Sequence, residues 1–185
     1  MNTKYTFTKS LVDRQNEAEK AMLEEFHNGD YTLEHPLVKL NPYFINPLAA
    51  VVLFKTEEEI AVTVTVLGKE PAGNMKHTFP KAKEHILPIL GLYGGYKNKV
   101  EIELYRSEKN TIEIETEPLS DDVPKLIKME TTASYLRDEL IIVSPALSSL
   151  ATGFDYQGEV RWHVNIPTVF DIKRAKNGNI LIGTH

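Results

Sequence analysis

The chain carries six histidines, the side chain best suited to nucleophilic or proton-transfer chemistry near neutral pH. Two are candidate catalytic residues: His163, which follows Trp162, and His185, which follows the apolar stretch Ile180–Thr184. A neutral imidazole can attack an activated ester, but neither histidine has a second histidine at metal-ligand spacing. An ordinary strand position is the more common interpretation of each. The other four histidines are predicted to be structural or solvated, with His85 at a strand end: His27, His35, His77 and His85.

Other site patterns are missing from the sequence. Gly91, Gly94 and Gly95 lack the spacing and the Lys-Ser/Thr pair of a phosphate-binding loop, and the chain has no cysteine to supply a thiolate ligand. Asp121-Asp122 is interpreted as a solvated linker, with a calcium loop as the alternative. LGLYGGYKN is interpreted as a turn whose tyrosines cap a core, with an aromatic or sugar pocket at Tyr93 and Tyr96 as the alternative. The sequence therefore predicts no metal site and no cofactor, and it offers only His163 and His185 as weak catalytic candidates.

Composition narrows the possible partners. The chain has 21 Lys and Arg against 26 Asp and Glu, a net charge of -5, and its basic residues are scattered rather than clustered. This balance argues against nucleic acid, because phosphate binding needs clustered basic side chains. The longest apolar run, Leu48 to Phe54, is too short to cross a bilayer. The polar N-terminus shows no signal peptide, so an exported protein would have lost its signal, and otherwise the protein would be cytoplasmic.

The elements that would position a site begin with a helix and continue as strands. Ser10 and Asp13 resemble a capping box, and Asn28-Gly29 predicts that the helix ends on a left-handed glycine. This helix is expected to pack one face on the protein, and a dimer contact is the alternative. Short apolar or alternating segments then predict strands joined by turns, as in an immunoglobulin-like β-sandwich: residues 48–54, 60–67, 75–79, 100–105 and 111–116.

A proline- and aspartate-rich linker near 118–124 precedes a different pattern. Strands are predicted near 126–132 and 140–143, followed by hairpins that turn at Gln157-Gly158 and at Asn177-Gly178. The two turn glycines lie 20 residues apart, so two hairpins make about one propeller blade. The predicted organisation is mainly β: an N-terminal helix and lead-in loop (1–39), a sandwich (40–118), and a linker with the first hairpins of an incomplete β-propeller (119–185).

A family resemblance enters at Asn41. The segments NPYFINPLAAVVLFKT, VTVTVLGK and HILPILGLYGGYKNKVEIEL resemble the N-terminal domain of bacterial arylsulfate sulfotransferases. FDYQGEVRWHV and FDIKRAKNGNILIGT then resemble the start of that family's catalytic propeller, through a D-x-x-G-x-x-x-W hairpin and an N-G-N-x-L turn. The resemblance covers about residues 40–185, in the family's order, and residues 1–40 carry no part of it.

The resemblance implies a specific chemistry. Family members transfer a sulfuryl group from a phenolic sulfate ester to a phenol acceptor through a sulfohistidine intermediate, without a nucleotide sulfate, and the resemblance also suggests a homodimer. The family's catalytic residues lie in later blades, and none can be carried onto this chain. We therefore expect the chain to be the N-terminal part of such an enzyme and inactive alone, with its open strand edges paired to a second copy. The alternative is a stand-alone β-sandwich binding or adhesion module.

Overall fold

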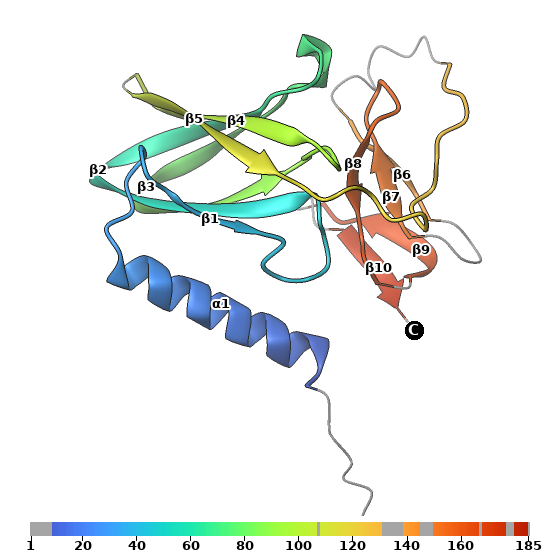
Figure 1. Ribbon diagram of the computed structural model, residues 1–185, viewed down its shortest axis with the longest axis horizontal. Helices are drawn as coiled ribbons and strands as arrows, with labels where there is room; N and C mark the ends of the chain where they lie inside the picture. Colours follow the sequence, from blue (N-terminus) through green and yellow to red (C-terminus); the bar gives the residue numbers. More distant parts are fainter. Residues whose placement is uncertain are drawn as a thin grey trace, which may run out of the picture.

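A computed structural model describes residues 9–106, 108–130, 139–144, 150–166, 168–176 and 180–184. The fold is mainly β, as predicted, with one helix ahead of the strands (Figure 1). Its elements, in chain order, are α1 (Leu11–Asn28), β1 (Leu37–Leu40), β2 (Ala49–Val66), a 3-10 turn η1 (Pro71–Gly73), β3 (Met75–Leu90), β4 (Lys97–Leu104), β5 (Lys109–Glu115), β6 (Ile141–Val143), β7 (Thr152–Phe154), β8 (Val160–His163), β9 (Thr168–Arg174) and β10 (Ile180–Thr184).

Helix α1 starts and ends where the sequence predicts. The Ser10 hydroxyl accepts a hydrogen bond from the Asp13 backbone N–H at 3.1 Å, which satisfies a free donor of the first turn. The predicted left-handed cap at Gly29 is wrong, because this residue is extended, with φ of -108°. The Lys55 ammonium instead donates to the Gly29 carbonyl at 3.1 Å. Glycine is needed there for space, since a Cβ would collide with the Tyr31 ring.

The two strands predicted at 48–54 and 60–67 are one continuous strand, β2. Its partner β3 is also longer than predicted, and it runs to Leu90 instead of ending at Phe79. The two strands pair antiparallel from Ala49↔Leu90 to Val66↔Met75, with register shifts between Lys55 and Val62. The charged run KTEEE looks like a loop in sequence. It instead forms the irregular middle of this ribbon, because bulges bend a strand without ending it.

The bend lets both halves of the β2–β3 ribbon face one core. The sheet order is β1-β2-β4-β5, with β3 on the other side of β2, and Figure 1 shows β4 and β5 on the side of the sandwich away from β1 and α1. The predicted hairpin of 100–105 and 111–116 is present as β4 and β5. Large side chains of this core come from the half of the ribbon that contains 49–55 and 84–90, from the residue just before it and from β4: Leu48, Phe54, Leu87, Ile89 and Ile102. The other half contributes Val62, Val64 and Val66.

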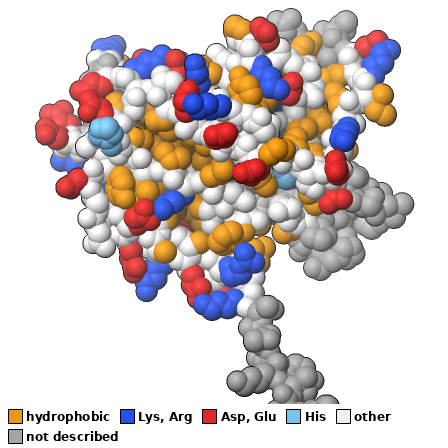
Figure 2. All heavy atoms as spheres, in the orientation of Figure 1, with side chains coloured by type: hydrophobic (Ala, Val, Ile, Leu, Met, Phe, Trp, Pro, Cys, Tyr) orange, Lys and Arg blue, Asp and Glu red, His pale blue; other side chains and the backbone are white. Residues whose placement is uncertain are grey.

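A second, smaller apolar cluster lies outside the sandwich. Met22 and Phe26 of α1 pack on Leu37 of β1 and on Val51 and Leu53 of β2. The outward side chains of this layer are therefore covered by the helix, which Figure 1 shows alongside β1. On the face shown in Figure 2, acidic and basic side chains are interspersed rather than gathered by sign. None of the helices in the described chain is long and apolar enough to span a bilayer.

Two small sheets follow the sandwich. The described part of the strand predicted near 126–132, residues 126–130, is not a strand. Strands β6, β7 and β8 form an antiparallel sheet, and β9 pairs antiparallel with β10. The hairpin at Gln157-Gly158 is confirmed: Gly158 has φ of +84°, and its N–H donates to the Asp155 carbonyl at 2.9 Å. The Asn177-Gly178 turn and His185 lie outside the described residues. That these sheets open a propeller stays a prediction.

Candidate functional site

The most unusual group in the described chain is a fully buried guanidinium where the sandwich meets the following hairpin. Arg161 of β8 is 0% exposed. Its Nε donates to the Gly91 carbonyl and its Nη1 to the Gly73 carbonyl, each at 2.8 Å. Its Nη1 also lies 2.9 Å from the Tyr93 hydroxyl, and its Cζ lies 3.9 Å from the centre of the Tyr93 ring. One side chain of the hairpin thus binds the loops at both ends of β3.

Asp155 balances the charge of Arg161. Its Oδ2 lies 2.9 Å from Nη1, and the side chains of both partners are buried. Its Oδ1 accepts from the backbone N–H groups of Gln157 at 2.9 Å and Glu159 at 3.0 Å. Both carboxylate oxygens therefore have donors, which is the condition under which a buried ion pair is tolerated. The same aspartate shapes the hairpin turn and holds the arginine, so the turn and the junction depend on each other.

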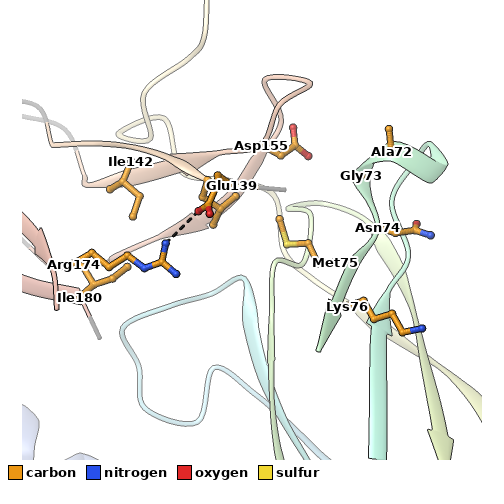
Figure 3. Close-up of a pocket in the computed structure, with 11 residues that line it drawn as sticks. Ala72, Gly73, Asn74, Met75, Lys76, Glu139, Ile142, Asp155, Arg174 and Ile180 are labelled. Atoms are coloured by element: carbon orange, nitrogen blue, oxygen red, sulfur yellow. Dashed lines mark hydrogen bonds and ion pairs between the residues drawn. The ribbon is translucent and has the colours of Figure 1, made fainter. Parts of the chain in front are cut away.

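A cavity of about 520 Å³ adjoins this ion pair. Gly73 and Asp155, both partners of Arg161, line it, together with Met75, Ile142 and Ile180 (Figure 3). Arg174 and Glu139 in its wall pair with each other at 3.2 Å. Figure 3 shows the Lys76 side chain pointing away from that pair. None of the described lining residues is a histidine, so the described walls do not hold the imidazole that a sulfohistidine route would need.

The candidate His163 lies on the same strand as Arg161 and is 3% exposed. It pairs in register with Thr152 of β7 and does not line the cavity. Burial lowers the pKa of the His163 imidazole, because removal from water disfavours its charged form. Its Nδ1 has no hydrogen-bond partner among the described residues. The other candidate, His185, lies outside those residues.

His85 is a buried structural histidine in the middle of β3, and its predicted place at a strand end is wrong. Its ring stacks on Phe54 with centroids 4.7 Å apart. Its Nε2 lies 3.1 Å from the Thr56 hydroxyl, which itself donates to the Glu58 carbonyl at 2.8 Å. The imidazole Nε2–H is therefore the donor to Thr56. Burial lowers the pKa of His85 as well.

The LGLYGGYKN segment is a turn that caps the core, as interpreted, and Tyr93 is not a ligand-facing residue. Tyr93 is 1% exposed, and its hydroxyl accepts from the Lys69 backbone N–H at 3.2 Å besides contacting Arg161. Asn98 closes the turn: its Oδ1 accepts from the Tyr93 N–H at 2.8 Å, and its Nδ2 donates to the Tyr96 carbonyl at 3.1 Å. An aromatic or sugar pocket at Tyr93 and Tyr96, the alternative interpretation, would therefore lack Tyr93. In the linker, Asp121 lies 3.6 Å from Lys125.

The Arg161–Asp155 pair was missed by the sequence reasoning, although one signal pointed to it. In VRWH, residues 160 to 163, alternation places Arg161 and His163 on one face and Val160 and Trp162 on the other. Hydrophobicity favours burial of the second face, whereas the structure buries the first. An acid at a hairpin turn and an arginine on its return strand were the available hint.

Comparison with known proteins relates the sandwich to a protein family. Residues 37–120 match a family model described as the arylsulfotransferase Ig-like domain. The match begins with β1 and ends beyond β5, so it includes Gly73, Gly91 and Tyr93 but not Asp155 or Arg161. No curated protein matches the chain.

Proposed function

Because residues 37–120 belong to the arylsulfotransferase Ig-like domain family, we propose that this chain is the N-terminal portion of an arylsulfate sulfotransferase. In this proposal the Ig-like domain supports a catalytic region and does not itself perform the reaction. The observation that carries it is the buried Arg161, which fixes the following β hairpin to two loops of the Ig-like domain. Residues 119–185 would then be the linker and the start of the catalytic propeller.

The proposed reaction moves a sulfuryl group from a phenolic sulfate ester to a phenol. A histidine nitrogen attacks the sulfur, the S–O bond to the donor breaks, and the donor phenolate leaves. The acceptor phenol gives its proton to a general base, and its oxygen attacks the sulfohistidine, which releases the neutral imidazole. Cationic side chains must neutralise the non-bridging oxygens in both steps. A nucleotide sulfate takes no part.

The contacts of this chain support a non-catalytic role for its own residues. Arg161 is engaged with carbonyl groups and Asp155, and His163 is buried beside it on β8. A sulfate-binding cation must reach substrate, and a nucleophile must be accessible. We therefore propose that the nucleophile and its cationic partners lie outside residues 1–185. A second copy of the chain is the proposed protein partner, and sedimentation at high concentration tests it: a monomer alone would contradict it.

The test compares this 185-residue chain with the product of the complete reading frame. Both are incubated with 4-nitrophenyl sulfate and a phenol acceptor, and release of 4-nitrophenolate is followed. We expect acceptor-dependent release only from a longer product. A stop codon directly after His185 would overturn the proposal. So would release by the 185-residue chain that His163→Ala abolishes while the circular dichroism spectrum stays unchanged.

A further inference from the structure

Strand β3 offers an unused backbone edge. Among the described residues, β3 is hydrogen-bonded only to β2, so the other edge of this 16-residue strand has no partner strand. Unpaired N–H and C=O groups on an edge are a template for adding another strand. Pro80 and Pro88 weaken that template over the later part of β3, because proline cannot donate. The segment Met75–Phe79 contains no proline.

An apolar groove accompanies this free segment. It has a volume of about 310 Å³ and is lined by both ends of β3, because the bend of the ribbon brings them to the same hollow. Met75 and Phe79 come from the first end, Leu90 comes from the second, and Val64 of β2 forms part of the floor. Leu90 is 56% exposed, so an apolar side chain that entered the groove would remove its surface from water.

The charge along β3 is opposite to that of the chain as a whole. Lys76, Lys81 and Lys83 are exposed, and none of the three forms an ion pair with a described residue. By contrast, eight other lysines pair with carboxylates. Lys81 and Lys83 lie beside four exposed glutamates of the ribbon, Glu57, Glu58, Glu59 and Glu84. Lys76 is the lysine that lines the groove. An unpaired cation beside an apolar groove favours a partner that carries an acidic side chain at the matching position.

We propose that the Met75–Phe79 edge binds an extended acidic peptide strand of another protein, with apolar side chains at alternate positions. Main-chain hydrogen bonds to the edge provide affinity, and the apolar side chains enter the groove. The acidic side chains lie on the face of Lys76. The apolar–acidic alternation is required because successive side chains of a strand point to opposite faces. This site is independent of sulfuryl transfer, and its failure would leave that proposal untouched.

The experiment measures fluorescence anisotropy of a labelled peptide titrated with the 185-residue chain. The probe is TIEIETE, the acidic alternating sequence of residues 111–117. A matched peptide, TIKIKTK, keeps the apolar positions and reverses the charge. We expect saturable binding of the acidic peptide alone, weakening as salt is added because exposed charges are screened. Amide exchange of residues 75–79 should slow when the acidic peptide is bound.

Two substitutions test the two halves of the proposal. Lys76→Glu and Leu90→Glu should each weaken binding about tenfold, since one removes the attraction and the other fills the groove with charge. Lys125→Glu and Val12→Glu are matched controls at exposed positions outside the groove and should bind as the wild type does. Absence of saturable binding, equal binding of both peptides, or full affinity in Lys76→Glu would each overturn the proposal. If the chain self-associates through this groove, the occupant is a second copy of the chain and not another protein, and the proposal is likewise overturned.

Discussion

Helix α1 and the β7–β8 hairpin are both attached to the Ig-like sandwich, but by contacts of opposite kinds. The helix inserts Met22 and Phe26 into an apolar cluster on the outer face of β1 and β2. The hairpin inserts Arg161, which meets backbone carbonyls and one carboxylate. Apolar packing is non-directional, whereas hydrogen bonds to fixed carbonyls accept one geometry only. The comparison indicates that the helix adds stability, whereas the Arg161 contacts also fix the position and orientation of the β7–β8 hairpin against the sandwich.

The two attachments meet at the loop that follows β1. The Gln15 side chain of α1 donates to the Tyr43 carbonyl at 2.8 Å. Two residues later the Ile45 carbonyl accepts from the Asn165 N–H, also at 2.8 Å. Phe44 between them has φ of +65°, a strained conformation for a bulky residue, and the Arg14 guanidinium lies 4.6 Å from its ring centre. The loop is therefore held from both sides.

Replacing Arg161 should have the largest effect. Arg161→Met leaves Asp155 buried without its cation and removes the donors to Gly91 and Gly73. We expect a loss of about 3–5 kcal/mol in the free energy of unfolding. Urea denaturation followed by the fluorescence of Trp162, the single tryptophan, measures it. Arg174→Met removes an exposed ion pair and should cost at most about 1 kcal/mol.

A double variant sharpens that result. Arg161→Met with Asp155→Asn removes the uncompensated charge but keeps an oxygen for the Gln157 and Glu159 N–H groups. We expect it to be more stable than Arg161→Met alone, because much of the single variant's loss is the cost of an unpaired buried carboxylate. Equal stability of the two variants would show that the carbonyl contacts, and not the charge, dominate the junction.

Removing the apolar anchor of α1 should come next. Phe26 is fully buried, and Phe26→Ala leaves a cavity between the helix and Leu53. We expect a loss of about 3 kcal/mol, at the low end of such substitutions because the helix can separate locally. Hydrogen exchange should speed up in residues 11–28 more than in β2. Val12→Ala, at a position 62% exposed, is the matched control and should change little.

Mild acid should destabilise the fold by a smaller amount through its two buried histidines. Burial lowers the pKa of His85 and of His163 below the ordinary value of 6.5. Below that pH the unfolded chain binds more protons at these positions than the folded chain, so stability is full above it and falls as the pH falls. The slope of unfolding free energy between pH 7 and 5.5 should be shallower in His85→Gln. An unchanged slope would contradict the assignment.

The smallest predicted effect is at the start of α1. Ser10→Ala removes the oxygen that accepts from the Asp13 N–H. Loss of such a cap costs about 1 kcal/mol. Because Ser10 is distant from the Phe26 anchor along the helix, we expect faster exchange only in the first turn and an unchanged signal from Trp162. Ser10→Asp, which keeps an acceptor, should retain wild-type exchange.

Local patterns predicted the elements, and long-range pairing corrected their lengths. Three features depend only on residues close in sequence and could be predicted: the Ser10 cap, the alternation in β4 and β5, and the Gly158 turn. The joining of 48–54 and 60–67 into one strand was not readable. The charged segment between them continues the strand only because β3 pairs alongside it. The family resemblance of the sandwich was readable from its apolar and glycine-tyrosine segments and agrees with the match to residues 37–120.

The sequence by itself determined the mainly β class, the capped helix, the turn at Gly158 and the family resemblance of the sandwich, because each follows from local periodicity, turn chemistry or a contiguous motif. Only the tertiary structure decided that Tyr93 is buried, that Arg161 is buried while Trp162 is only partly so, and that β3 pairs with β2 alone among the described residues. Burial of a charge depends on partners far away in the chain: Gly73 is 88 residues from Arg161 and Gly91 is 70. No local pattern encodes where such carbonyls will lie.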